Sequence, residues 1–369
     1  MKLQYRAIEG TNTKTRRLAY LTAIVSALRH ESFSRQFLLA KLVQWSEEHK
    51  TNLRNYIVQT GEVTSTRRNS AGAHYLELAT KLGTIAPIAG AYRVTRIGLV
   101  LYELIRQYKP NDNPFFLSDV ERIFYTYHLL DRDADMLLTI MDHVAQAEES
   151  YLSHLQKSFQ TDFLRRLEQK SPVCQDESVR QYLLERRTKV SNEWMKPEKY
   201  AEHLVPPRLN WLLDLGFLKQ NEFRQHYYVF RAEGTDLLSV IPTLECGSFH
   251  HDITERWLAS EYWEIAARTL THIESQVCWE RIDEEQKCNL AKPLLLEIFE
   301  VFRYSSVPKV SLTQALLYLV IRILMDHKII VCPVILGDWL SLPRVIDRRR
   351  YAVRFSPREN ESYITVTAI

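Results

Sequence analysis

A pattern that occurs twice along this chain constrains its fold more than any other feature. Residues 92–98 (YRVTRIG) and residues 228–234 (YVFRAEG) both begin with tyrosine and end with glycine. A leucine-glycine pair, Leu82-Gly83 or Leu215-Gly216, closes an apolar segment shortly before each of them. Each copy therefore predicts a helix stopped by glycine, a short strand, a polar turn, a second strand and a new helix.

The first copy can be followed residue by residue. Ser70 can cap a helix over 71–82, since its hydroxyl can accept an early backbone N–H. We expect strands over 84–86 and 91–95 around a turn that contains proline and glycine. A further helix is expected over 99–108.

The second copy gives a parallel set of expectations. Pro206-Pro207 is expected to begin its helix, because proline is tolerated at the first helical position. Gly216 is expected to end that helix. Strands are expected over 217–218 and 226–230, with residues 220–224 as a polar tip between them.

The doubled pattern resembles the winged helix-turn-helix superfamily of DNA-binding proteins. The residues that carry the resemblance are 82–85 with 92–98, and 215–218 with 228–234. The resemblance implies that the helix before the glycine enters the major groove, while the hairpin, or wing, contacts the backbone or the minor groove. Together the two copies span about a third of the chain.

The C-terminal part suggests a third unit of the same kind. Ser311 can cap an apolar helix over 312–325, and residues 329–334 look like a strand. Residues 344–350 form a basic turn before a hairpin over 351–355 and 362–367. This region lacks the glycine signature, so a plain helical domain with a terminal hairpin stays an alternative.

The expected fold class is mainly α with small β-hairpin wings, in several winged-helix units joined by helical segments. At 369 residues the chain exceeds what one core supports. We expect a winged-helix domain over 1–110, a helical connector over 111–178, a second winged-helix domain over 179–246 and a C-terminal helical domain over 247–369. Within the connector, Ser118 and Glu121 match a capping box.

Composition limits the classes of function. The net charge is only +3, so any basic surface must be local. Long apolar runs and a leader segment are absent from the sequence, which favours a cytoplasmic protein without membrane contact. The five scattered cysteines do not form a disulfide framework.

Basic and polar residues near the two wings and in the C-terminal turn are the candidate DNA contacts, since Arg and Lys neutralise phosphates. They are Arg67, Arg68, His74, Lys81, Arg93 and Arg96 in the first copy, Arg208, Asn210, Lys219 and Arg224 in the second, and Arg344, Arg348, Arg349 and Arg350 at the C-terminus. Acidic neighbours, among them Asp214 and Glu233, weaken the case for the second copy.

Enzyme and metal signatures are weak. Cys246 and the histidines after it lack the paired ligands of a structural zinc site, so no metal ligand is assigned. Glu285-Gln286-Lys287 gives a Glu-x-Lys without the clustered carboxylates that a Mg²⁺ nuclease needs. A Walker-type phosphate loop is missing too. We therefore expect no catalytic residue and no cofactor.

The sequence favours a protein that binds double-stranded DNA without catalysis of its own. It would be the recognition or scaffold subunit of a DNA-processing, antiviral defence or transcription-regulating assembly, with other protein subunits or a second copy of the chain as partners. One alternative is a winged-helix adaptor that contacts only protein, and another is a divergent Mg²⁺-dependent nuclease.

Overall fold

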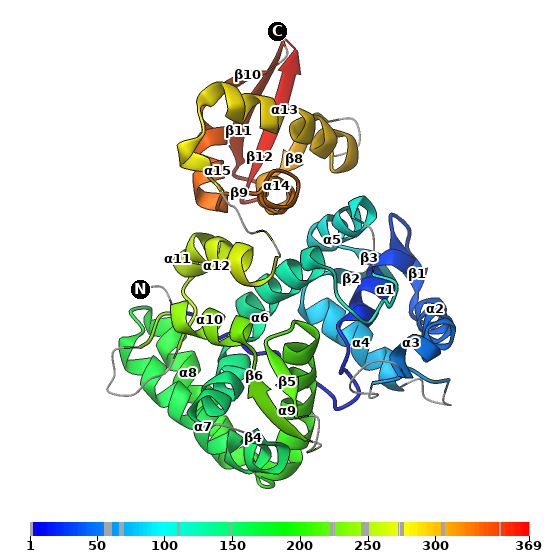
Figure 1. Ribbon diagram of the computed structural model, residues 1–369, viewed down its shortest axis with the longest axis vertical. Coiled ribbons are helices and arrows are strands. Elements are labelled where there is room, and N and C mark those ends of the chain that lie inside the picture. The colour runs from blue at the N-terminus through cyan, green and yellow to red at the C-terminus, as the bar shows by residue number, and fades with distance from the viewer. Residues whose placement is uncertain are drawn as a thin grey trace. The chain divides into compact units, whose positions relative to one another are not determined.

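The computed structural model folds into two compact units (Figure 1). Unit 1 comprises residues 1–95 and 110–258, and unit 2 comprises residues 96–109 and 259–369. Both are mainly helical, with small sheets of two to four strands. The structure describes residues 3–54, 61–65, 70–108, 111–147, 150–221, 224, 226–244, 251–271, 273, 277–303, 307–346 and 348–368.

The first part of unit 1 contains the first copy of the repeated pattern up to Thr95, while residues 96–98 belong to unit 2. Gly83 has a φ of +77° and lies two residues after the last residue of α4, as expected for a glycine stop. The three strands form an antiparallel sheet in the order β1-β3-β2. The elements are α1 (Ala19–Leu28), β1 (Phe33–Ser34), α2 (Arg35–Glu48), α3 (Lys50–Arg54), α4 (Ser70–Lys81), β2 (Ile85–Ile88) and β3 (Ala91–Val94).

The rest of unit 1 contains the second copy. The predicted capping box forms, because Ser118 and Glu121 bond each other's backbone N–H groups at the start of α6. The strands again pair so that the first lies against the third, in the order β4-β6-β5. The elements are α6 (Asp119–Gln146), β4 (Ser150–Tyr151), α7 (Leu152–Val173), α8 (Glu177–Glu193), α9 (Pro197–Asp214), β5 (Leu218–Gln220), β6 (Tyr227–Phe230), α10 (Ala232–Val240) and α11 (Glu255–Ala259).

The expected helix start at Pro206-Pro207 is wrong, because both prolines lie inside α9, which begins at Pro197. A proline has no N–H to donate to the carbonyl four residues earlier. The carbonyl of His203, four residues before Pro207, instead accepts a hydrogen bond from the Thr11 hydroxyl at 3.1 Å. The N-terminal segment thus replaces a bond that α9 cannot make within itself.

Gly234 shows why the second copy ends in glycine. An ideal Cβ at this position would lie 2.3 Å from the carbonyl oxygen of Phe217 and 2.5 Å from the Phe230 ring. The start of α10 can approach β5 and β6 this closely only without a side chain.

Unit 2 contains the terminal hairpin, which forms as predicted. Its four-stranded antiparallel sheet has the order β10-β11-β12-β8. The elements are α5 (Arg96–Gln107), α12 (Glu261–Thr269), β7 (Val277–Cys278), a 3-10 turn (Trp279–Arg281), α13 (Glu284–Val301), β8 (Lys309–Ser311), α14 (Leu312–His327), β9 (Ile329–Ile330), α15 (Pro333–Ser341), β10 (Arg344–Ile346), β11 (Arg349–Ser356) and β12 (Glu361–Ala368).

Two expectations for unit 2 need correction. Only Ile329–Ile330 of the strand expected over 329–334 form a strand, β9, because the helix α15 begins at Pro333. β9 pairs in parallel with β7. Leu336, Trp339 and Leu340 are buried at helical spacing, so α15 is a packed helix. The basic turn expected over 344–350 consists instead of strand β10 and the start of β11.

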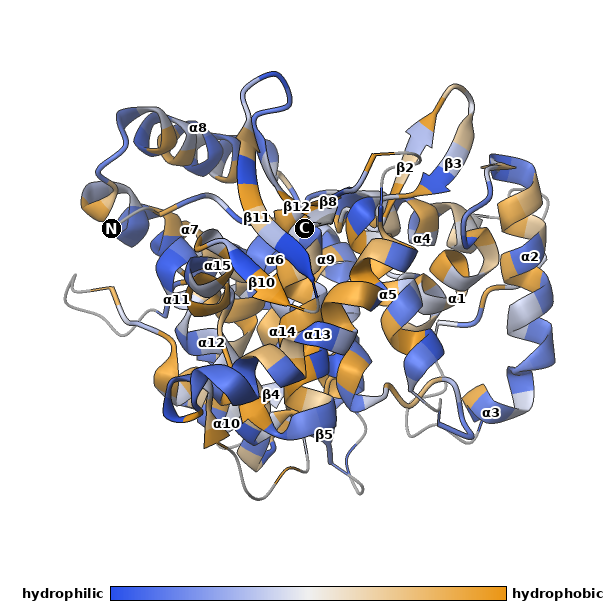
Figure 2. Ribbon diagram, turned by 90° about the horizontal axis from the view of Figure 1, so that it is seen from above, coloured by the Kyte–Doolittle hydropathy of each residue, from blue (hydrophilic) through white to orange (hydrophobic). Residues whose placement is uncertain are grey.

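The core of unit 2 centres on α14. Ser311 caps this helix as predicted, and most residues from Ala315 to Leu324 are buried. Figure 2 shows the helix as largely apolar. Among the described residues, no helix combines the length and apolar character needed to cross a bilayer.

Candidate nucleic-acid interface

The two described candidates on α4 lie beside an acidic residue. His74 and Lys81 are each about one-third exposed and pair with Glu77, at 3.7 Å and 2.7 Å. Most of the helix faces inward, where the Tyr75 hydroxyl accepts a hydrogen bond from the backbone N–H of Arg17. The helix therefore presents a narrow, charge-balanced stripe. Arg67 and Arg68 lie outside the described residues.

The remaining first-copy candidates belong to different units. Arg93 is exposed on β3 of unit 1, where its Nε donates to the Ser32 hydroxyl. Arg96 begins α5 in unit 2, forms an ion pair with Glu361 and lies 5.9 Å from the centre of the Tyr363 ring.

The prediction that Arg208 and Asn210 contact DNA is wrong, because both side chains are buried. Arg208 forms two hydrogen bonds with Asp133, at 2.7 Å and 2.8 Å, and also donates to the carbonyls of Leu204 and Ile8. The Asn210 amide donates to the carbonyl of Pro206 at 2.7 Å. These groups hold α9 in the interior of unit 1.

Lys219 and Arg224 lie on or beside the hairpin of β5 and β6. Both are exposed, and the guanidinium of Arg224 lies 5.6 Å from the centre of the Tyr227 ring. The acidic neighbour Asp214, which argued against DNA contact by the second copy, is buried and pairs with Arg17 at 2.7 Å. Its charge is therefore used within unit 1 rather than presented on the surface.

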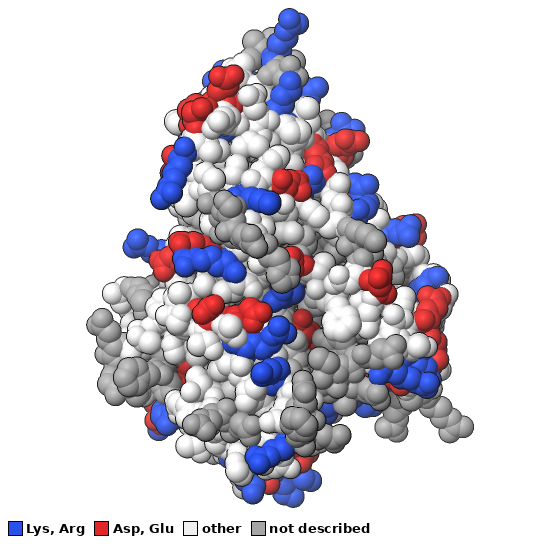
Figure 3. Space-filling view, viewed as in Figure 1, with Lys and Arg blue, Asp and Glu red and all other residues white. Residues whose placement is uncertain are grey.

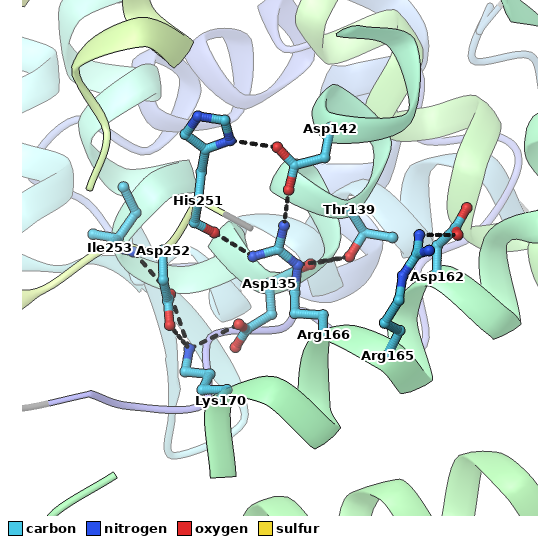
Figure 4. A network of polar contacts seen from close by, with 10 residues as sticks. All are labelled: Asp135, Thr139, Asp142, Asp162, Arg165, Arg166, Lys170, His251, Asp252 and Ile253. Carbon is cyan, nitrogen blue, oxygen red and sulfur yellow. Dashed lines mark hydrogen bonds and ion pairs between the residues drawn. The ribbon is translucent and has the colours of Figure 1, made fainter. Parts of the chain in front are cut away.

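Unit 1 also contains a buried charge network that sequence patterns did not indicate (Figure 4). Lys170 lies 2.8 Å from Asp135 and 3.0 Å from Asp252, and all three side chains are buried. Beside them, Arg166 pairs with Asp142. Burial raises the pKa of Asp252, while the charge of Lys170 opposes the shift. The network joins α6, α7 and the segment before α11.

The buried charges of this network compensate one another. Each buried cation faces a carboxylate, which is how a protein compensates the cost of removing charge from water. Within the described part of the chain, no group of three or more His, Cys, Asp or Glu residues could hold a metal ion. Glu285, the candidate for a nuclease, lies in the first turn of α13.

The C-terminal sheet offers an open basic face. Arg350, Ala352 and Arg354 occupy every second position of β11, so their side chains lie on one face of the sheet, and both arginines are exposed. The register places Thr367 opposite Arg350 and Tyr363 opposite Arg354. Lys309 of β8, opposite Thr365, lies on the same face. Among the described residues, neither Arg350 nor Arg354 has an ion pair or hydrogen bond through its side chain.

The opposite face of this sheet is packed. Tyr351 and Ile364 are buried there, and the Tyr351 ring lies 5.9 Å from the ring of Phe299 on α13. Tyr351 and Ile364 thereby fix the hairpin on this side, while Arg350 and Arg354 are exposed on the other, where Tyr363 is covered by Arg96 and Lys309. The arginines are presented from a paired, eight-residue strand rather than from a loop.

The other C-terminal candidates divide into paired and unpaired groups. Arg344 pairs with Glu284 at 3.0 Å and covers the Trp339 ring. Arg348 and Arg349 are exposed at the end of the sheet where β12 terminates, since Arg349 lies opposite Ala368. Figure 3 shows Lys and Arg atoms at this tip, near the C-terminus.

The acidic residues of the hairpin are already engaged. Glu359 pairs with Lys309 at 3.0 Å. Burial acts to raise the pKa of Glu361, but hydrogen bonds from Arg96, Ser311 and Tyr363 lower it overall. These carboxylates stay ionised and neutralise their own partners, whereas Arg350 and Arg354 have no acidic partner among the described residues.

Comparison with known proteins adds no family assignment. No protein-family model matches the chain, and no curated protein matches its sequence.

Proposed function

We propose that the chain contains three winged-helix units. The support is a strand order that recurs with the same chain direction in β1-β3-β2, β4-β6-β5 and β8-β12-β11. In each set, a short strand leads into helices and pairs with the last strand of a hairpin that follows them; in the third set β9 and β10 also lie between the short strand and the hairpin. The third set lacks the glycine signature of the other two but has the longest hairpin.

We further propose that the protein binds double-stranded DNA through the C-terminal sheet. The observation that carries this proposal is the open face on which Arg350 and Arg354 stand without acidic partners among the described residues. Arginines at this spacing can neutralise neighbouring phosphates, and the exposed Thr367 hydroxyl opposite Arg350 can donate a hydrogen bond to the same oxygens. The protein would act as a recognition or scaffold subunit without catalysis of its own.

A gel-shift titration of mixed-sequence duplex DNA across a salt series tests this function. Arg350→Glu/Arg354→Glu is expected to weaken binding at least tenfold at low salt and to make the salt dependence shallower by about two contacts. Lys196→Glu/Lys199→Glu changes the net charge equally at two exposed positions, the N-cap and the first turn of α9, and should bind like the wild type. Equal losses in the two variants, or salt-independent binding, would refute the assignment.

A protein adaptor is the second candidate, and one observation favours it. Of the helices that precede the first two wings, α4 presents only a narrow, charge-balanced stripe, and α9 is buried along most of its length from Leu204 onward. Those two wings would then support the fold and the binding of other subunits. Stoichiometric capture of a partner, with DNA affinity absent in the wild type, would favour this function.

A further inference from the structure

Unit 1 contains a cavity that neither the DNA-binding proposal nor the winged-helix pattern uses. Its volume is about 420 Å³, within the range of small-molecule sites. Its lining residues come mainly from residues 5–12, α8 and the start of α9. Apolar walls come from residues such as Met136, Phe163 and Leu204, and polar groups come from Asn12 and His203.

An aromatic stack forms one wall of this cavity. The rings of Trp194 and Tyr200 are nearly parallel, with centroids 5.2 Å apart and an interplanar angle of 5°. Phe163 continues the stack behind Trp194, at 6.3 Å and 9°. Tyr200 ends the series and is 43% exposed. A stack that ends on an accessible ring can be extended by another planar ring.

The polar groups around the stack suit the edge of a heteroaromatic ring. The Asn12 side-chain oxygen accepts a hydrogen bond from the backbone N–H of Lys14, which leaves its amide N–H groups without a partner among the described residues. The imidazole of His203 is exposed and has no partner within that same part of the chain. Donors and acceptors at the border of an apolar slot are what a nucleobase edge requires.

The cavity also has a cation near its mouth. Lys189 is about half exposed, and its nearest acidic partner, Glu193, lies 4.0 Å away. By contrast, Arg186 is held by Glu9 at 3.1 Å and by the hydroxyl of Tyr182. Lys189 is therefore the cation that can reorient toward a phosphate.

We propose that this cavity binds a nucleotide. Its base would stack on Tyr200, and its phosphate would contact Lys189. A mononucleotide and an unpaired nucleotide of single-stranded DNA share this chemistry. Asn12 and His203 would contact the polar edge of the base. The site lies in unit 1, so it is independent of the basic sheet face of unit 2.

Isothermal titration calorimetry on the full chain tests the proposal with AMP and with a single-stranded oligodeoxyadenylate of about ten nucleotides. Ribose 5-phosphate, which lacks the base, serves as the control ligand. We expect AMP or the oligonucleotide to bind and ribose 5-phosphate not to bind. Binding by AMP indicates a nucleotide site, whereas binding by the oligonucleotide alone indicates a single-strand site.

Variants separate stacking from general surface effects. Tyr200→Ala should weaken base binding about tenfold, because it removes the terminal stacking partner, and Tyr200→Phe should retain it. Phe37→Ala removes an aromatic ring of equal exposure from α2 and should have no effect. The oligonucleotide arm is repeated in the Arg350→Glu/Arg354→Glu background, which removes the other proposed binding surface.

Three outcomes would overturn the proposal. They are the absence of binding by both AMP and the oligonucleotide, equal binding by ribose 5-phosphate, and unchanged affinity in a Tyr200→Ala protein that unfolds at the wild-type temperature. If Tyr200→Ala fails to fold, Asn12→Ala and Lys189→Ala replace it, and unchanged affinity in both would be equally decisive.

Discussion

Replacement of Arg208 by methionine should destabilise unit 1 strongly, because the change leaves a buried carboxylate without its charge partner. Arg208 donates two hydrogen bonds to Asp133, two to the carbonyls of Leu204 and Ile8, and one to the Thr11 hydroxyl. After the substitution, the backbone N–H of Ile8 at 2.7 Å would be the remaining donor to Asp133 among these contacts.

The magnitude follows from burial. Both side chains of the pair are completely inaccessible to solvent. Removal of one partner from a buried pair costs about 3–5 kcal/mol of unfolding free energy. With a urea dependence of about 2.5 kcal/mol per molar, the midpoint of unfolding should fall by roughly 1.5 M. Tryptophan fluorescence measures this transition, since the buried Trp211 lies next to Arg208.

Arg165→Met is the matched control. Arg165 also pairs with an aspartate, Asp162, at 2.6 Å, but its side chain is 47% exposed. An exposed pair contributes at most about 1 kcal/mol, so this variant should unfold close to the wild-type midpoint. The double variant Arg208→Met/Asp133→Leu should recover much of the loss, because apolar residues can replace a buried pair. Equal midpoints for Arg208→Met and Arg165→Met would refute the reasoning.

Three further predictions concern stability. Burial in α6, with a smaller effect from Arg132, lowers the pKa of His128 from 6.5 to about 3. Between these two pH values the unfolded state binds more protons than the folded state. The free energy of unfolding should therefore fall by about 1.4 kcal/mol for each pH unit below 6.5. Urea titrations at pH 7 and pH 5 should show this loss in the wild type but not in His128→Phe, and an equal loss in both would contradict the assignment. Gly234→Ala should lower the free energy of unfolding by about 2–3 kcal/mol, because its Cβ would overlap the Phe217 carbonyl. Gly337→Ala in α15, where the Cβ would make only an ordinary contact with Leu316, should raise it by up to about 1 kcal/mol, as measured by thermal unfolding. Ser118→Ala removes the cap of α6 and should cost about 1 kcal/mol, while Ser118→Asp, which can still accept the cap hydrogen bond, should unfold near the wild-type temperature.

Signals that act within a few residues predicted helix ends well. The capping box at Ser118 and the cap at Ser311 depend only on neighbours in the next turn. Gly83 and Gly216 end their helices through their own backbone conformation, with φ of +77° and +80°. The terminal hairpin was equally visible, because alternation along a strand is a local property.

Errors arose where a residue's partner lies far along the chain. Arg208 looked like a DNA contact beside a wing, but its partner Asp133 is 75 residues away. Pro206-Pro207 looked like a helix start because the Thr11 hydroxyl that compensates α9 comes from the N-terminal segment. The basic C-terminal residues were found from local charge density, but which of them are compensated depends on ion pairs such as Arg344 with Glu284.

The assignment of α5 to unit 2 affects how the chain can fold during synthesis. This helix buries Val100, Leu101 and Leu104, and it packs against α14, which begins about 200 residues later. At a translation rate of about 5–20 residues per second, α5 leaves the ribosome roughly 10–40 s before its partner exists. Its apolar stripe must be shielded for that interval, by transient contacts with the nascent chain or by a chaperone. Completion of unit 2 therefore waits for the synthesis of residues 259–369, however early unit 1 begins to fold.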